Sequence, residues 1–231
     1  QFFTTNKSDT GTISITLPSV SARLSAGDVT SYNIDILNAE GKPVISVSAG
    51  ISTFTFKEIP AGKYTVLVEA LESDANTSYV LAKGNTDVKV TGGETANAAI
   101  TLKSLSLMFV KGVNAEFSFV EREWKGTSKQ DALNWGEPND SNSGETPKKP
   151  LASIQKAVDK IIQKSKASSD ENAEYIIYVN GCLSPENIIS PDEIKIQEKP
   201  LADFSSLGES KLNITIAGAG NGSFGGANAI L

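Results

Sequence analysis

The sequence contains no histidine, one cysteine and one methionine among its 231 residues. Histidine is the commonest general base and the commonest zinc ligand, so its absence excludes Ser-His-Asp triads and removes the usual zinc chemistry. A single cysteine, Cys182, cannot form a disulfide within the chain, and no cationic neighbourhood activates it. The sequence therefore predicts no catalytic, cofactor-binding or metal-binding residues, and stability must come from packing.

Long apolar runs and clustered positive charge are also missing. No stretch approaches the roughly 18–20 apolar residues that a membrane span requires. The net charge is −6, and Lys148 with Lys149 forms only a short basic spot beside a proline. Nucleic-acid binding depends on clustered Lys and Arg. We therefore expect neither a transmembrane span in this chain nor a nucleic-acid partner.

Short alternating segments occupy residues 10–102. Apolar and polar residues alternate at 13–17 and 32–36, which is the period-2 pattern of a half-buried strand. The turn residues at 38–42 include a glycine for positive φ, and a return strand is predicted at 43–48. Further strands are predicted at 54–56, 64–68, 79–82, 88–90 and 98–102. About seven strands without a helical pattern between them predict an antiparallel β-sandwich.

The segment 56–66, with the sequence FKEIPAGKYTV, resembles the turn and following strand of prealbumin-like sandwiches. These include carboxypeptidase regulatory-like and collagen-adhesin B-type repeats. Pro60 fixes φ before the bend, Gly62 permits the bend, and Tyr64 and Val66 return to the core. Because such a motif recurs in unrelated modules, it specifies a fold better than a function.

One clear helix is predicted at 151–165. Its apolar residues form a single stripe, and Ser153 is a suitable N-cap. Apolar strand patterns follow at 175–179 and 213–218, and the second leads into a glycine-rich segment at 218–228.

The order of polar loop, helix, strand and glycine turn over residues 135–231 resembles the opening of pectin-lyase-like right-handed parallel β-helix proteins. In that family an amphipathic helix covers the open end of the solenoid. The resemblance implies a helix cap and first coils at 151–231, with a connector at 103–150 and a linker or disordered segment at 1–9. Repeat stacks need at least three units, so we expect the natural chain to continue beyond Leu231.

Three segments share composition with functional motifs but not their spacing. Asp192 and Glu193 are adjacent on a predicted strand and point to opposite faces, so they cannot easily share one acid–base site. Like them, Glu186 is interpreted as an exposed surface charge. Residues 140–145 lack the ligand positions of a calcium loop and indicate an Asx-rich turn. Residues 218–222 lack the Lys-Ser/Thr of a phosphate-binding loop.

Two tryptophans, Trp124 and Trp135, remain as candidate ligand contacts. Their rings could stack on a sugar face, or equally seal the junction between the two modules. We therefore expect a non-enzymatic bacterial cell-surface or secreted protein for binding or adhesion. The sandwich would serve as stalk and the β-helix as presenting face.

The expected location is extracytoplasmic, with a lipid anchor upstream of Gln1 and carbohydrate or a host matrix protein as partner. Two alternatives stay open. One is the N-terminal portion of a secreted polysaccharide lyase or glycoside hydrolase whose active site lies beyond residue 231. The other is a purely structural spacer.

Overall fold

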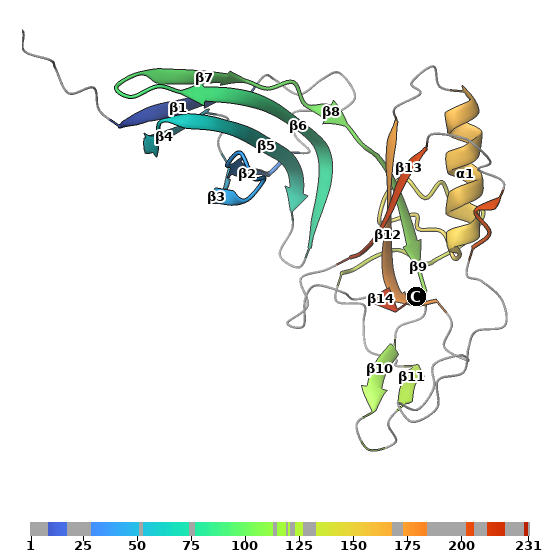
Figure 1. The fold of residues 1–231 in the computed structure, drawn as a ribbon. Coiled ribbons are helices and arrows are strands. Elements are labelled where there is room, and N and C mark those ends of the chain that lie inside the picture. Colours follow the sequence, from blue (N-terminus) through green and yellow to red (C-terminus); the bar gives the residue numbers. More distant parts are fainter. Residues whose placement is uncertain are drawn as a thin grey trace, which may run out of the picture. The chain divides into compact units, whose positions relative to one another are not determined.

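A computed structural model gives the conformation of much of the chain. It describes residues 9–17, 29–50, 53–73, 77–112, 115–118, 120, 123–126, 133–167, 173–183, 202–205, 212–219 and 229–230. The chain divides into an N-terminal unit, Gln1–Ser73 with Tyr79–Ser104, and a C-terminal unit, Asp74–Ser78 with Leu105–Leu231. The described part is mainly β, as expected (Figure 1). Residues 1–8 of the expected linker lie outside it.

The strands of the N-terminal unit form two sheets. Their bounds are β1 (Thr10–Thr16), β2 (Ser31–Leu37), β3 (Pro43–Ala49), β4 (Thr53–Pro60), β5 (Gly62–Ser73), β6 (Ser78–Val90), β7 (Thr95–Ala99) and β8 (Lys103–Ser104). One sheet has the order β4-β1-β7 and the other the order β3-β2-β5-β6-β8. Strand β1 pairs antiparallel with β4 but parallel with β7, so the expected sandwich is not antiparallel throughout.

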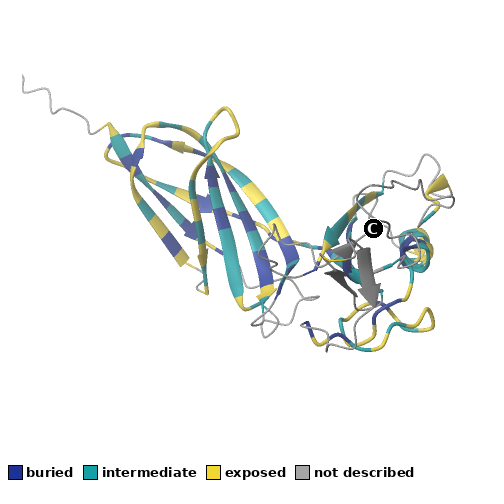
Figure 2. Ribbon diagram, turned by 90° about the horizontal axis from the view of Figure 1, so that it is seen from below, coloured by how far each residue is buried: buried dark blue, intermediate teal, exposed yellow. Residues whose placement is uncertain are grey.

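A single apolar core joins these two sheets. Ile13 and Ile15 of β1 and Ile34 and Ile36 of β2 are all 0% exposed and belong to the same cluster. Buried residues alternate with partly exposed residues along β1 and in the second half of β2 (Figure 2), as the period-2 sequence pattern predicted. Burying each such side chain stabilises the fold by roughly 1.5–3 kcal/mol.

Two turns show where local prediction held and where it did not. The predicted turn between β2 and β3 is confirmed, with Gly41 at φ 75° and Ile36 paired to Ile45. In the bend near Pro60 the positive φ belongs to Glu58, at 60°, and not to Gly62. The segments predicted as separate strands at 79–82 and 88–90 form the single strand β6.

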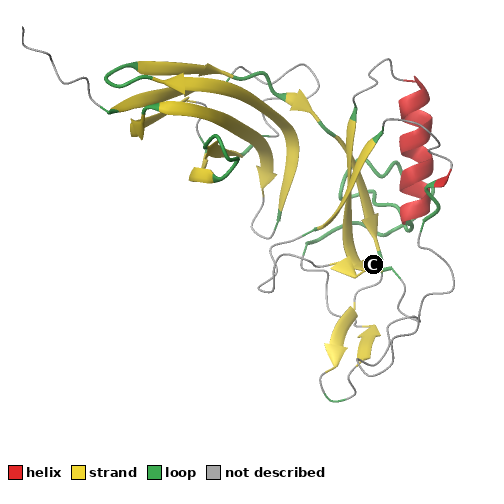
Figure 3. Cartoon of the chain, in the orientation of Figure 1, coloured by secondary structure: helices red, strands yellow, loops and turns green. Residues whose placement is uncertain are grey.

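The C-terminal unit contains a parallel sheet and a helix (Figure 3). Its elements are β9 (Ser106–Lys111), β10 (Ala115–Ser118), β11 (Glu123–Gly126), α1 (Ile154–Ala167), β12 (Glu174–Cys182), β13 (Asn213–Gly218) and β14 (Ala229–Ile230). Strands β9, β13 and β14 all pair with β12 in parallel, whereas β10 and β11 form an antiparallel pair. Strand β9 lies within the expected connector.

Helix α1 packs its apolar stripe against the sheet residues. Ile154, Ala157, Val158 and Ile161 are buried in one cluster that also contains sheet side chains such as Ile177. The helical period of 3.6 residues and the strand period of two each place apolar side chains on one side of their element. The apolar side of α1 therefore packs against the apolar face of the sheet. No helix in the described ranges is long and apolar enough to cross a membrane.

The N-terminus of α1 is held by two side chains. Ser153 Oγ accepts the backbone N–H of Lys156 at 3.2 Å, which confirms the predicted N-cap. Asp140 Oδ1 accepts the backbone N–H groups of Ala152 at 2.9 Å and Ser153 at 3.1 Å, and Ser153 Oγ donates to Asp140 Oδ2 at 2.9 Å. The role of Asp140 was not predicted, because it precedes the helix by a whole loop.

This parallel sheet does not by itself establish the expected β-helix. Residues 184–201 and 220–228, which would complete the coils, lie outside the described part of the chain.

Candidate functional site

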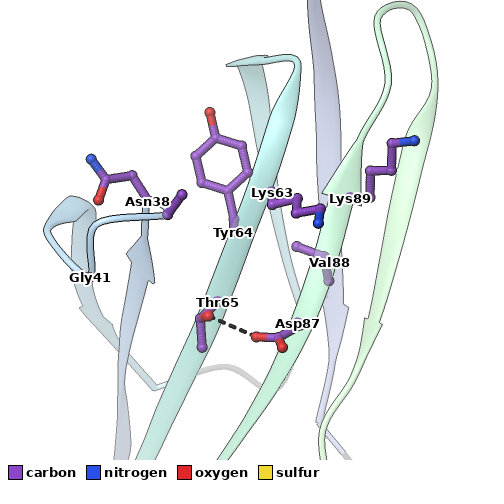
Figure 4. Close-up of a pocket in the computed structure, with 9 residues that line it drawn as sticks. Asn38, Gly41, Lys63, Tyr64, Thr65, Asp87, Val88 and Lys89 are labelled. Atoms are coloured by element: carbon purple, nitrogen blue, oxygen red, sulfur yellow. Dashed lines mark hydrogen bonds between the residues drawn. The ribbon is translucent and has the colours of Figure 1, made fainter.

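A groove of about 520 Å³ lies at one end of the five-stranded sheet of the N-terminal unit. It is lined by Asn38, Ala39 and Gly41 of the β2–β3 turn, by residues 63–65 of β5 and by residues 87–89 of β6 (Figure 4). We call it the Tyr64 groove. Adjacent strands β2, β5 and β6 bring these three segments together.

The turn that forms one wall is braced by its own hydrogen bonds. Asn38 Oδ1 accepts the backbone N–H groups of Glu40 at 3.1 Å and Lys42 at 2.9 Å. The backbone N–H of Gly41 donates to the Asn38 carbonyl at 2.9 Å. The Asn38 side-chain oxygen is therefore occupied, and its NH₂ group has no partner among the described residues, so it can donate to a ligand.

Tyr64 supplies an aromatic surface in a defined position. Its hydroxyl donates to the Pro60 carbonyl at 3.0 Å, and its half-buried ring packs partly against the sandwich core. A Cβ at Gly62 would meet ring carbon Cε2 at 3.4 Å, so the ring lies alongside this glycine. Figure 4 shows the ring on β5, with the Asn38 turn on one side and Lys63 on the other.

The floor contains a cross-strand polar pair. Thr65 Oγ1 donates to Asp87 Oδ1 at 2.7 Å, which links β5 to β6. Asp87 is exposed and lies beside the buried Val88. The pair keeps the carboxylate in one orientation, where its second oxygen can accept a hydrogen bond.

Two ammonium groups complete the groove. Lys63 and Lys89 are both exposed, and among the described residues neither ammonium group forms a hydrogen bond or an ion pair. Asp87 is the one carboxylate of the lining. The Tyr64 groove thus offers one aromatic face, several hydrogen-bond donors and acceptors, and a local excess of positive charge. These groups can bind a ligand.

The two tryptophans singled out from the sequence lie elsewhere, in the C-terminal unit. Trp135 is 5% exposed, and its ring meets Phe109 edge-on at a centroid distance of 5.3 Å. Phe109 in turn stacks on Tyr178 at 5.7 Å. A ring enclosed in this way has little free face for a sugar.

Trp124 lies in β11, where its backbone pairs with Phe117 of β10, and its side chain is not among the parts that the structure describes. The described residues do not bring the two tryptophans into one site, and a contact of Trp124 with ligand stays a prediction. The groove residues were missed because the β2–β3 turn and the strand segments 63–65 and 87–89 were recognised separately, and nothing local indicates that these three segments are neighbours.

The composition-based motifs have structural roles where they are described. Asn139 Oδ1 accepts the backbone N–H of Ser141 at 2.8 Å, an Asx turn, and Gly144 has φ 75°. In the described ranges no three His, Cys, Asp or Glu side chains are grouped as metal ligands would be. Glu186, Asp192 and Glu193 lie outside those ranges.

No protein-family model and no curated protein sequence matches this chain. Several solved structures show a weak likeness, among them three bacterial proteins. The TIE protein of Bacillus anthracis is 19% identical with a TM-score of 0.30, over 46% of this chain and 19% of that one. A Bacteroides thetaiotaomicron protein (DUF1812), to which polysaccharide binding is attributed, is 11% identical with a TM-score of 0.29. The match covers 45% of this chain and 51% of that one.

A Bacteroides eggerthii protein, to which cell adhesion is attributed, is 10% identical with a TM-score of 0.32, over 63% of this chain and 62% of that one. The matched part is less than two thirds of each of the three proteins. Binding or adhesion is attributed to two of these neighbours, but likeness of this degree carries no argument about function.

Proposed function

We propose that this protein is a non-enzymatic, extracytoplasmic binding protein and that the Tyr64 groove binds carbohydrate. One observation carries the proposal. The Tyr64 ring is held by its hydroxyl at the wall of a groove that also contains the hydrogen-bonding side chains of Asn38, Thr65 and Asp87 and the two lysines. Sugar rings present an apolar face bordered by hydroxyl groups, so an aromatic face surrounded by donors and acceptors is complementary to them.

The dimensions and exposure of the groove fit a polymer chain. Its volume of about 520 Å³ lies within the roughly 300–1,000 Å³ of small-molecule sites. Ala39, Lys63 and Lys89 are exposed, so the groove opens to solvent and a bound sugar can belong to a longer chain. This proposal places carbohydrate contact on the sandwich, which the sequence had suggested as a stalk.

We also propose that the C-terminal unit begins a right-handed parallel β-helix capped by α1. The order β9, β12, β13 across the sheet follows the order along the chain, and the pairs run in continuous register. Parallel crossovers are right-handed in about 98% of cases. Helix α1 covers the apolar face that a first coil would otherwise expose. Trp124 remains the candidate ligand contact on this unit.

The test compares two tyrosines that pack on the same core. Tyr64→Leu keeps an apolar side chain but removes the aromatic face, and Tyr32→Leu does the same at a half-buried tyrosine outside the groove. If a sugar contact is worth as much as an aromatic pair, about 0.5–1.5 kcal/mol, Tyr64→Leu weakens polysaccharide binding by roughly 2- to 13-fold. Tyr32→Leu leaves affinity unchanged.

Affinity is measured by biolayer interferometry on a panel of immobilised neutral and acidic polysaccharides, after circular dichroism has shown that both variants are folded. Absence of binding to every polysaccharide, or equal losses in the two variants, would contradict the proposal. Release of new reducing ends or of unsaturated sugars during the incubation would favour the lyase or hydrolase alternative.

A further inference from the structure

The two lysines of the Tyr64 groove occupy equivalent places on neighbouring strands. On β5, Lys63 is two residues before Thr65, and on β6, Lys89 is two residues after Asp87. Thr65 and Asp87 are joined by a hydrogen bond across the two strands. Residues two positions away on the same strand lie on the same face. Lys63 and Lys89 therefore lie on the same face of the sheet as Thr65 and Asp87. Figure 4 shows the two lysines on the adjacent strands β5 and β6.

This arrangement leaves an excess of positive charge, because two lysines face a single carboxylate. Like charges on neighbouring strands of one face are destabilising. Asp87, the carboxylate of the lining, accepts the neutral Thr65 hydroxyl and keeps its negative charge, so it offsets one of the two lysines. The turn residues Glu40 and Lys42 offset each other. Among the described residues no carboxylate pairs with either groove lysine. The protein carries a net charge of −6, so a positive groove runs against its overall charge.

From this geometry we infer that the Tyr64 groove selects acidic polysaccharide, with Lys63 and Lys89 contacting anionic groups of the bound polymer. By the same rule Tyr64 lies on the core-facing side of β5, so these contacts need not fall on the sugar that stacks on its ring. The inference rests on the proposed carbohydrate binding and adds the ligand class to it. An ammonium group is a point charge that does not distinguish a carboxylate from a sulfate by shape. The recognised chemistry is therefore an anionic substituent on a sugar ring.

The experiment uses polymers matched in backbone. Polygalacturonate is compared with fully methyl-esterified pectin, and dextran sulfate with dextran, each binding to the whole chain by biolayer interferometry. The wild-type chain is expected to bind the anionic member of at least one pair at least tenfold more tightly. The pair that shows this preference identifies the anion as carboxylate or sulfate. The preference should decrease between low and high salt, because exposed charges are screened.

Protein variants then locate the effect. Lys63→Gln with Lys89→Gln is expected to weaken binding of the acidic polymer by roughly 2- to 30-fold, as loss of two exposed ion contacts allows. Lys57→Gln with Lys149→Gln changes net charge equally at two exposed lysines outside the groove, and should leave affinity unchanged.

The outcomes separate the two proposals. Equal binding of charged and neutral polymers, with Tyr64→Leu still harmful, overturns the acidic preference and leaves carbohydrate binding intact. Equal losses in the two double variants assign the preference to overall charge and also overturn the inference. If no polymer binds, or if Tyr64→Leu has no effect, the proposed function itself fails.

Discussion

Replacing Gly144 by alanine measures how tightly the loop before α1 is packed beneath β9. Gly144 has φ 75°, and its carbonyl accepts the backbone N–H of Phe109 at 2.8 Å. An added Cβ would lie 2.7 Å from Leu151 Cδ1 and 3.3 Å from Met108 Sδ. Leu151 and Met108 are both 0% exposed, so neither side chain has free space to move into. The substitution therefore combines backbone strain with overpacking.

The two costs can be estimated separately. A left-handed conformation costs an alanine about 1–2 kcal/mol. Inserting a methyl group into a filled core costs about 1–3 kcal/mol. Gly144→Ala should therefore lower the free energy of unfolding by about 2–5 kcal/mol, a large share of the roughly 5–15 kcal/mol of a typical domain.

Gly93→Ala is the matched control, because Gly93 has φ 76° and its added Cβ would meet nothing within 4 Å. It should show the strain alone, about 1–2 kcal/mol. Both variants are compared by urea titration followed by circular dichroism and, for Gly144→Ala, by the fluorescence of the buried Trp135. If Gly144→Ala is no more destabilising than Gly93→Ala, the packing argument is refuted.

Three further changes test other parts of the structure. Asp140→Ala removes an acceptor shared by Ala152 and Ser153 at the start of α1, and should destabilise the fold by about 0.5–2 kcal/mol in the same titration. Ile34→Ala, at a side chain 0% exposed in the sandwich core, should cost about 2–5 kcal/mol by circular dichroism. The hydrogen bond and charge of Lys164 lower the pKa of Glu145 in the folded protein. The pair therefore stabilises the fold at pH values above the pKa of this carboxyl in the unfolded chain. This stabilisation is lost as the pH falls through the lowered pKa of the folded state. Because the two side chains are 41% and 54% exposed, screening limits this effect to about 0.2–1 kcal/mol. Lys164→Gln should reduce that acid dependence in titrations at pH 3–7, and the remainder is due to the charge of Lys160.

The sequence determined which residues enter the cores, because alternation and helical stripes are properties of neighbouring positions. The period-2 patterns identified Ile13, Ile15, Ile34 and Ile36 as buried, and all four are. The helix stripe and the Ser153 cap placed a helix at 151–165, and α1 runs from Ile154 to Ala167. Turn chemistry likewise identified the bend at Gly41.

Only the tertiary structure decided which strands become neighbours, because the faces of a strand say nothing about the partner at its edge. This is why β1 lies parallel to β7, why β9 pairs with the distant β12, and why Trp135 is enclosed by Phe109. The Tyr64 groove has the same origin. Its three segments look like ordinary turns and strand ends in the sequence, and they form one site because β2, β5 and β6 pair side by side.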